Sequence, residues 1–358
     1  MSAGTIETAR DQPGFDELLR EWDGEQAEIR YDAASGAWMF ICLHSTRLGP
    51  AAGGTRMRVY PSAAEGLADA MRLSAAMTRK LAIAGLPFGG GKAVLAVPVI
   101  PRGEKRRRLL LRYAELLDSL RGRFWTGPDM NTNECDMDLI SSPYALIRSE
   151  DRGGPGSSAP ATAVGVLHGI RASVRHEFGS DRLDGLVVLV QGVGGVGGRL
   201  AELLVEAGAR VLVSDVDAAR ARRVASGLSA RAVAPDGALR TDCDLAAPCA
   251  IGSVLDERSI PQLRCRIVAG SANNQLATLA DGGRLRRAGI LYAPDYVINS
   301  GGALHGIGLE VLGWTRDELD RRLAAIGETL TAVYREADEQ GIPTSEAAER
   351  LAAARLGS

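Results

Sequence analysis

The sequence contains very little lysine. Only three of its 42 lysine and arginine residues are lysines, at positions 80, 92 and 105. Arginine stays charged near neutral pH, whereas a lysine amine can lose its proton when burial or a neighbouring cation lowers its pKa. Arginine supplies almost all the positive charge of this chain, so a lysine suggests a need for more than charge. We therefore treat Lys80 and Lys92 as candidate catalytic residues, against the alternative that they are ordinary surface lysines.

Other absences exclude whole classes of function. No apolar run approaches the ~18 residues of a membrane span, and the acidic, polar N-terminal segment is unlike a signal peptide. The formal net charge of −2 gives no reason to expect nucleic acid or an anionic membrane as a partner. The five cysteines are odd in number and lack zinc-site spacing, which predicts a reducing compartment and no metal. We expect a cytoplasmic protein.

A chain of 358 residues is long enough for two domains. After Arg148 the composition shifts to "SEDRGGPGSSAP", which predicts a hinge. We predict an α/β protein whose first domain spans residues 1–150 and whose second spans 151–319. The helical tail, about 320–358, is expected to pack back on the first domain.

The most informative stretch of the second domain runs from Val187 to Asp215. An apolar run leads into a glycine-rich turn, leucines follow at helical spacing up to Gly208, and a second apolar run ends at Asp215. This order of strand, turn, helix and strand is typical of a dinucleotide-binding unit, in which the helix N-terminus faces a pyrophosphate. The expected cofactor contacts in the turn are Gly192, Val193, Gly194, Gly195, Val196 and Gly197.

Asp215 indicates which dinucleotide is bound. A carboxylate at the end of this strand accepts hydrogen bonds from a ribose diol and repels a 2′-phosphate, which favours NAD over NADP. The arginines at 220, 222 and 223 leave a phosphate clamp open as an alternative, although a solvated helix face is the simpler interpretation. Further strand-like segments at 245–247, 267–269 and 290–291 predict that the parallel sheet continues.

The first domain begins with a predicted β-hairpin over residues 27–43, around the turn "DAASG". The segment "LGPAAGGTR", residues 48–56, is predicted to be a loop whose glycines let a ligand approach the backbone. A capping box at Ser62 and Glu65 then starts a helix, and its apolar stripe places Lys80 on the last turn.

Two further segments of the first domain carry candidate chemistry. Three glycines, followed by Lys92 and a strand-like run, would let a substrate approach the amine closely. An amphipathic helix is predicted over residues 107–120. Asp129 then lies in "FWTGPDMNTN" at the end of an apolar stretch, a usual place for a catalytic carboxylate and equally for an ordinary turn aspartate.

Six motifs in this order resemble the glutamate/leucine/phenylalanine/valine dehydrogenase family: "GPAAGGTR", "PFGGGK", "TGPDMNT", "GVGGVG", "AGSANN" and "APDYVINSGG". From about Trp22 onward the chain is similar to the actinobacterial phenylalanine dehydrogenases. The resemblance implies a substrate domain, then a Rossmann-type doubly wound NAD-binding domain, with a deep cleft between them. It implies reversible conversion of an L-amino acid, NAD⁺ and water to a 2-oxo acid, ammonia and NADH. We also expect a homo-oligomer, since an edge strand such as 29–31 could pair across subunits.

The resemblance also implies a role for each candidate residue. Lys80 would bind the substrate carboxylate with the backbone of Gly53 and Gly54. Lys92 would deliver the attack of water on an iminium intermediate, and Asp129 would shuttle a proton to and from the substrate nitrogen. The remaining residues implied at the amine and the cofactor are Thr162, Cys249, Ala250, Asn273 and Asn299.

We infer the substrate from the small side chains in the expected substrate pocket. Glutamate-specific relatives carry a lysine where this chain has Ala52, so an acidic side chain would be buried unpaired. Small residues leave room for a ring, which favours L-phenylalanine or another bulky hydrophobic amino acid, tryptophan included. A branched-chain (leucine or valine) dehydrogenase is the main alternative, and a non-catalytic NAD-binding sensor is a distant one. The residues expected around the side chain are Gly127, Pro128, Ala303, Gly306 and Ile307.

Overall fold

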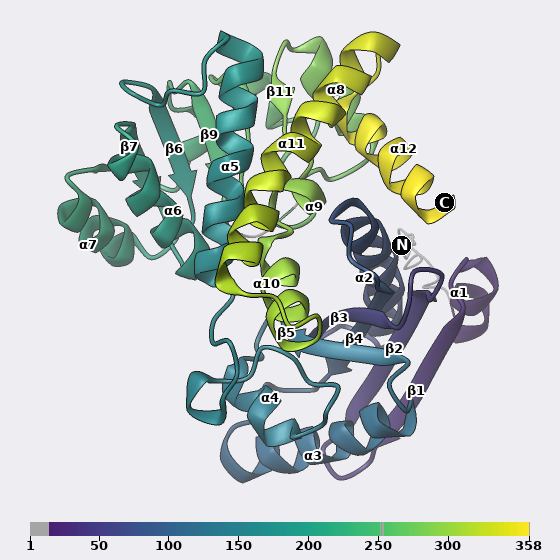
Figure 1. The fold of residues 1–358 in the computed structure, drawn as a ribbon. Helices are drawn as coiled ribbons and strands as arrows, with labels where there is room; N and C mark the ends of the chain where they lie inside the picture. Colours follow the sequence, from purple (N-terminus) through teal and green to yellow (C-terminus); the bar gives the residue numbers. More distant parts are fainter. Residues whose placement is uncertain (1–13, 251, 253, 358) are drawn as a thin grey trace, which may run out of the picture. The chain divides into compact units, whose positions relative to one another are not determined.

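The computed structural model describes residues 14–250, 252 and 254–357 (Figure 1). The first 13 residues, which begin the polar N-terminal segment, lie outside the described part. The chain divides into two compact units. Unit 1 comprises Met1–Thr78 and Phe88–Ala145, and unit 2 comprises Arg79–Pro87 and Leu146–Ser358. No helix of the described residues is long and apolar enough to cross a membrane.

Unit 1 is built on a five-stranded mixed sheet in the order β1-β2-β4-β3-β5. Strands β1 and β2 form the predicted hairpin, and β2 is also antiparallel to β4. Strand β3 is parallel to both β4 and β5. The strands are β1 (Gln26–Asp32), β2 (Ala37–Ser45), β3 (Ala51–Arg58), β4 (Gly89–Ala96) and β5 (Phe124–Pro128).

Helices cover both faces of this sheet. Successive side chains of a strand point to opposite faces, so Ile41 of β2 packs in the cluster that contains Leu110, while Phe40 packs with Leu67. Leu110 lies on α3 and Leu67 on α2, so each face has its own core. The helices expected from the capping box and from residues 107–120 are confirmed. The helices are α1 (Phe15–Glu21), α2 (Ala63–Ile83), α3 (Gly103–Ser119) and α4 (Glu134–Ile140).

The prediction of a loop at residues 48–56 was wrong, because most of this segment is strand β3. Glycine is uncommon in strands, but it is required where another backbone approaches closely. A Cβ on Gly53 would lie 1.9 Å from the carbonyl oxygen of Gly91 on the neighbouring strand. The glycines therefore allow β3 and β4 to pair, and Lys92 lies inside β4 rather than just before the strand.

Unit 2 contains a six-stranded parallel sheet in the order β11-β10-β9-β6-β7-β8. The strands predicted from the sequence are confirmed, with small shifts at their ends. The sheet extends in one direction through β7 and in the other through β9, so β6 lies at the switch point where α/β sheets bind ligands. The strands are β6 (Val187–Gln191), β7 (Arg210–Ser214), β8 (Arg231–Ala232), β9 (Leu245–Pro248), β10 (Ile267–Val268) and β11 (Leu291–Tyr292).

Helix α5 (Ala159–Phe178) packs against both α6 (Gly195–Glu206) and α11 (Arg316–Gln340), as Figure 1 shows. The Ser173 hydroxyl on α5 lies 2.7 Å from the Tyr334 hydroxyl on α11. The remaining helices are α7 (Ala218–Leu228), α8 (Ala280–Arg287), α9 (Asp295–Ile298), α10 (Gly301–Glu310) and α12 (Thr344–Gly357). Short 3-10 turns lie at η1 (Glu150–Arg152), η2 (Ala238–Arg240) and η3 (Ile260–Gln262).

The two C-terminal helices pack within unit 2. Both belong to unit 2, where α11 packs along α5 and α12 contacts α8 and β11. Glycines on α5 admit the apolar stripe of α11, since Gly165 faces Ile326 and Gly169 faces Leu330. From the N-terminal half, residues 79–87 belong to the same unit, and Arg355 of α12 donates a hydrogen bond to the carbonyl of Ile83.

Candidate active site

Lys92 and Asp129, two of the expected catalytic residues, form an ion pair in unit 1. Lys92 Nζ lies 2.6 Å from Asp129 Oδ2, and the lysine side chain is only 7% exposed. Gly54 of β3 lies beside them, and a Cβ there would be 2.8 Å from Asp129 Cβ and 3.4 Å from Lys92 Nζ. The missing side chain therefore leaves the space that the amine and the carboxylate occupy.

The backbone of Asp129 is fixed by a tight turn. Its N–H donates to Thr132 Oγ1 at 2.9 Å, and the N–H of Thr132 donates back to the Asp129 carbonyl at 2.9 Å. Thr132 Oγ1 also donates to the carbonyl of Thr55 on β3 at 2.7 Å. Because the backbone makes the turn, the carboxylate of Asp129 is available to pair with Lys92.

The electrostatics of this pair suit proton transfer. Burial lowers the pKa of Lys92, Asp129 opposes that effect, and Arg56 adds to it. Burial alone would raise the pKa of Asp129, but Lys92 and Arg56 outweigh it and lower that pKa. A buried amine that loses its proton more easily than usual thus lies beside a carboxylate that stays ionised.

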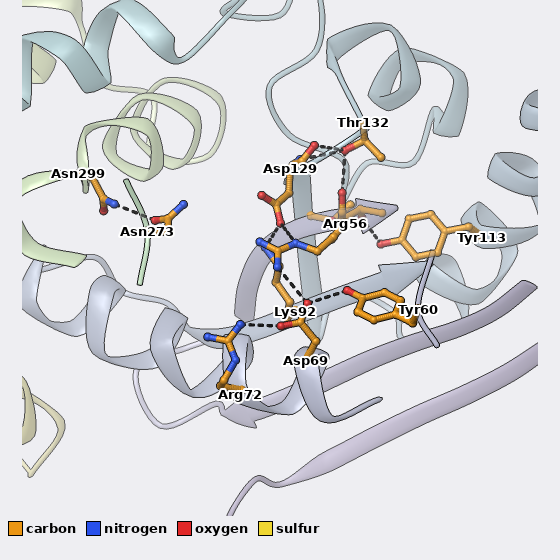
Figure 2. A network of polar contacts seen from close by, with 12 residues as sticks. Arg56, Tyr60, Asp69, Arg72, Lys92, Tyr113, Asp129, Thr132, Asn273 and Asn299 are labelled. Carbon is orange, nitrogen blue, oxygen red and sulfur yellow. Dashed lines mark hydrogen bonds and ion pairs between the residues drawn. The ribbon is translucent and has the colours of Figure 1, made fainter. Parts of the chain in front are cut away.

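Arg56 is a site residue that the sequence reasoning missed. Its Nε donates to Asp129 Oδ2 at 3.0 Å, and its Nη1 donates to Asp69 Oδ2 at 3.0 Å (Figure 2). The hydroxyl of Tyr60 donates to the same Asp69 oxygen at 2.6 Å. Assigning residues 48–56 to a loop hid the signal, because an arginine between Thr55 and Met57 in a buried strand requires carboxylate partners.

The expected substrate-binding residues of unit 1 lie on adjacent strands. In the parallel register of β3 and β5, Gly53 pairs with Thr126, and Gly54 pairs with Gly127. Pro128 follows as the last residue of β5, directly before Asp129. Ala52 is buried at 3% exposure in the same strand as the two glycines. The structure therefore brings these residues together with Lys92 and Asp129.

The glycine-rich turn of unit 2 has the geometry of a pyrophosphate site. Gly192 adopts φ +93°, and a Cβ on Gly197 would lie 1.9 Å from the carbonyl oxygen of Gly192. Apart from its chain neighbours, no atom of the described residues lies within 4 Å of where a Cβ on Gly194 would be, and this residue caps α6 without a side-chain hydrogen bond. The space beside Gly194 is therefore open at the N-terminus of α6, where the first backbone N–H groups of a helix lack intrahelical partners, which fits an anion.

Asp215 follows β7 and is 6% exposed. Its carboxylate accepts the N–H of Val193 at 3.0 Å and that of Asp217 at 2.9 Å, which ties it to the glycine turn. A carboxylate offers about four acceptor positions, so acceptors remain for a ribose diol. Arg220 Nη1 lies 3.5 Å from both oxygens of Asp215, whereas Arg222 and Arg223 are exposed.

Asn299 and Asn273 lie together in unit 2 (Figure 2). Asn299 Nδ2 donates to Asn273 Oδ1 at 2.8 Å and to the carbonyl of Ser271 at 3.0 Å. Asn299 Oδ1 is buried and has no hydrogen-bond partner within the described residues. A buried unpaired acceptor costs free energy, and the amide of a nicotinamide could donate to it. The asparagine pair therefore fits the expected cofactor.

The other expected cofactor residues lie on the same unit. Thr162, on the first turn of α5, is 8% exposed and donates to the carbonyl of Ser158 at 2.9 Å. A Cβ on Gly197 would lie 3.0 Å from Cys249 Cβ, and one on Gly192 would lie 2.7 Å from Ala250 Cβ. Cys249 and Ala250 therefore border the glycine turn.

Lys80 lies on the last turn of α2, in the part of that helix that belongs to unit 2. Its positive charge acts on Asp295, a residue that we had not singled out. Burial raises the pKa of Asp295, and Lys80 is among the groups that oppose the rise. The N–H of Gln275 donates to Asp295 Oδ2 at 3.3 Å.

The expected side-chain wall on α10 differs from the open space that we inferred at Gly306. A Cβ on Gly306 would lie 2.7 Å from Ile147 Cγ1, so Ile147 already fills the space beside this glycine. Ile147 has φ +60°, which is strained for a β-branched residue, and its N–H is held by the Glu310 carboxylate. Ile307 is buried and Ala303 is half-buried on the same helix.

Two family models match this chain. The family model "Glu/Leu/Phe/Val dehydrogenase, dimerisation domain" matches residues 28–145, and "Glutamate/Leucine/Phenylalanine/Valine dehydrogenase" matches residues 219–358. Leucine dehydrogenase of Geobacillus stearothermophilus is 39% identical over 94% of this chain and 92% of its own length. Valine dehydrogenase of Streptomyces virginiae is 42% identical over 93% of each chain.

A solved structure is also similar along nearly the whole chain. The crystal structure of L-tryptophan dehydrogenase from Nostoc punctiforme has a TM-score of 0.80 and 39% identity, and the match covers 96% of this chain and 98% of that one.

Within the described residues, no group of three or more His, Cys, Asp or Glu side chains could hold a metal ion. The chain belongs to the glutamate/leucine/phenylalanine/valine dehydrogenase family and is an amino acid dehydrogenase with NAD as its cofactor.

Proposed function

We propose that the protein catalyses the NAD-dependent, reversible oxidative deamination of an aliphatic L-amino acid, with leucine or valine preferred. The buried pair of Lys92 and Asp129 carries the proposal, because it joins an amine of lowered pKa to an ionised carboxylate at 2.6 Å. Ala52 offers no positive charge to an acidic side chain. Relatives named leucine and valine dehydrogenase support aliphatic substrates, and they led us to revise our expectation of phenylalanine.

The proposed mechanism divides proton handling between two residues of unit 1. Once hydride has left the substrate carbon, Lys92 as a free amine takes a proton from the water that attacks the iminium carbon. Asp129, ionised at rest, relays that proton from Lys92 to the substrate nitrogen. The hydroxyl of the water adduct then gives its proton to Lys92 as the C=O bond forms, the C–N bond breaks and ammonia leaves. Lys80 binds the substrate carboxylate, and its neighbour Asp295 limits the positive charge there. Asn273 orients the substrate amine.

The cofactor supplies the hydride chemistry, so the chain needs only to bind and orient it. The N-terminus of α6 would bind the pyrophosphate, and Asp215 would bind the ribose diol. Thr162 and the unpaired Oδ1 of Asn299 would hold the carboxamide of the nicotinamide. These assignments concern residues of unit 2 alone.

The direct test is a panel of amino acids assayed with NAD by absorbance of NADH. We expect leucine and valine to exceed phenylalanine and tryptophan in kcat/KM by roughly 10-fold or more, because Ile147 fills the space beside Gly306. A preference for an aromatic substrate would overturn the aliphatic assignment. NADH binding without turnover of any amino acid would favour the sensor instead.

An aromatic substrate is the second candidate, because a tryptophan dehydrogenase is similar over nearly the whole chain. If Ile147 is what limits the pocket, Ile147→Ala should raise the ratio of phenylalanine to leucine kcat/KM roughly 10-fold. Alanine also tolerates the φ of +60° better than isoleucine does. Ile260→Ala, a buried isoleucine of another cluster, is the control and should leave the ratio unchanged.

We further propose that the protein is a homo-oligomer. Strand β1 lies at one edge of the unit 1 sheet, and Tyr31 on it is 51% exposed. The family model that matches residues 28–145 is described as a dimerisation domain. Light scattering after size-exclusion chromatography should give a multiple of the chain mass, and a monomer at micromolar concentration would contradict the proposal.

A further inference from the structure

The ion pair of the candidate site has a third member that shares its oxygen. Arg56 Nε and Lys92 Nζ lie 3.0 Å and 2.6 Å from Asp129 Oδ2. Two cations therefore hold the same oxygen of the carboxylate.

Arg56 is itself held in place by a buried carboxylate. Its Nη1 lies 3.0 Å from Asp69 Oδ2, and the two side chains are 10% and 12% exposed. Tyr60 donates to Asp69 Oδ2 at 2.6 Å, and Arg72 donates to Asp69 Oδ1 at 2.6 Å. Both carboxylate oxygens of Asp69 therefore accept hydrogen bonds. The planar guanidinium group of Arg56 donates to two carboxylates at once, those of Asp129 and Asp69 (Figure 2).

The charge balance of this cluster explains what Arg56 adds. Arg56 and Lys92 are positive, Asp129 and Asp69 are negative, and Arg72 is half-exposed at the rim. If Lys92 and Asp129 were alone, loss of the lysine proton would leave a buried carboxylate without a cation, which is strongly unfavourable. With Arg56 present, Asp129 keeps a cation partner after Lys92 becomes neutral.

We propose that Arg56 is a positioning residue for the deamination reaction: it keeps Asp129 ionised and oriented while Lys92 gains and loses its proton, and Asp69 anchors it. The inference rests on the proposed function, because it assigns the proton cycle of that function to Lys92 and Asp129. It also gives Asp69 and Tyr60 a role: they hold the permanently charged Arg56 beside Lys92, which gains and loses a proton.

The cluster predicts shifts of opposite sign for two charge-removing substitutions. Arg56 lowers the pKa of Lys92, so Arg56→Gln should raise that pKa. Asp69 raises the pKa of Lys92, so Asp69→Asn should lower it. The activity that requires neutral Lys92 should therefore begin at higher pH in the first variant and at lower pH in the second. If the two substitutions only disrupted packing, the pH at which activity begins would not shift in opposite directions.

The scarcity of lysine makes a direct measurement possible. Lys80, Lys92 and Lys105 fall in separate stretches of sequence, so limited acylation with acetic anhydride at a series of pH values, read by peptide mass spectrometry, titrates each amine. Lys105 is exposed on α3 and serves as the reference in the same sample. We expect Arg56→Gln to raise the Lys92 midpoint by about 1 pH unit or more, because both cations contact one oxygen. Asp69→Asn should lower it.

Two further variants separate charge from geometry. Arg56→Lys keeps the charge but loses the fork, so its Lys92 midpoint should stay within about 0.5 pH unit of wild type while kcat falls roughly 10-fold. Arg58→Gln is the matched control, because Arg58 lies on the same strand, is exposed and lies 5.3 Å from the Tyr60 ring centroid. It should change neither the Lys92 midpoint nor kcat.

The outcomes distinguish this inference from the proposed function. An unchanged Lys92 midpoint in Arg56→Gln, or shifts of the same sign in Arg56→Gln and Asp69→Asn, would refute it. If Arg56→Gln does not fold, Asp69→Asn is sufficient: a raised or unchanged Lys92 midpoint in that variant would refute the inference. The labelling needs no substrate, so failure of wild type to turn over any amino acid would refute the function and leave the titration readable.

Discussion

The buried polar groups of the two units differ in whether they are paired within the protein. In unit 1, Lys92, Arg56, Asp129 and Asp69 pair with one another, so the cluster is electrostatically complete without a ligand. In unit 2, Asn299 Oδ1 is buried without a partner, and the space before Gly194 is open. In the function that we propose, unit 1 supplies the preset charges that proton transfer requires, and unit 2 supplies the polar groups that a bound cofactor satisfies.

This difference predicts which observable each unit controls. Changes within the charge cluster should act on turnover and on its pH dependence, since the substrate enters an already formed field. Changes within the glycine turn or at Asp215 should act on the affinity for the dinucleotide.

The largest expected effect is that of Lys92→Arg. The substitution keeps the positive charge beside Asp129, but a guanidinium does not deprotonate near neutral pH, so kcat should fall by about 100-fold or more. NADH affinity, measured by fluorescence titration, should stay within about twofold, because the nucleotide turn is in unit 2. Lys105→Arg is the control, with the same change on the exposed face of α3. Turnover near the wild-type rate would remove Lys92 from the mechanism.

Gly197→Ala should have the next largest effect. The new methyl group would lie 1.9 Å from the carbonyl oxygen of Gly192, so the turn must open, and NADH affinity should fall by about 30-fold or more. Gly198→Ala is the matched control, since its Cβ would lie 3.5 Å from the nearest atom outside the helix. It should bind NADH normally and raise the midpoint of thermal unfolding slightly, because alanine favours helices. Equal affinities would mean that the turn does not bind the pyrophosphate.

Asp215→Ala should have the smallest of the three effects. It removes an acceptor for the ribose diol and a repulsion against a 2′-phosphate, and it leaves Arg220 without the carboxylate 3.5 Å away. The ratio of kcat/KM for NAD to that for NADP should fall about 10-fold. Asp217→Asn keeps the cap of α7 and should leave the ratio unchanged. A wild type that uses both cofactors equally would contradict our interpretation of Asp215.

The sequence predicted unit 2 better than unit 1, and the reason is local. The glycine turn and the strands at 187–191 and 210–214 are adjacent in sequence, so their order identifies the fold. Strand β3 was missed because its glycines argue against a strand, and only pairing with β4 and β5 explains them. Arg56 was missed for the same reason, since it lies on the strand that we had not predicted and its partner Asp69 lies on α2.

The candidate site shows the same limit. Lys92 and Asp129 were singled out separately, one for the scarcity of lysine and the other for its place after an apolar stretch. Nothing in the sequence alone predicted that they pair at 2.6 Å, since 37 positions separate them. Nor could spacing predict that Ile147 fills the space beside Gly306, because the two are brought together by the fold of unit 2.

Helix α5 carries Gly165 and Gly169 four residues apart, and both face bulky side chains of the helices that pack on it. In membrane proteins this small-xxx-small spacing lets two helices approach closely, and here it serves the same purpose at a buried helix face. Each glycine weakens the isolated helix by roughly 1 kcal/mol relative to alanine. Replacing these glycines with alanine, a common way to stabilise a helix, is therefore unfavourable here, because the added methyl group would crowd Ile326 of α11 at Gly165 and Ile298 of α9 at Gly169.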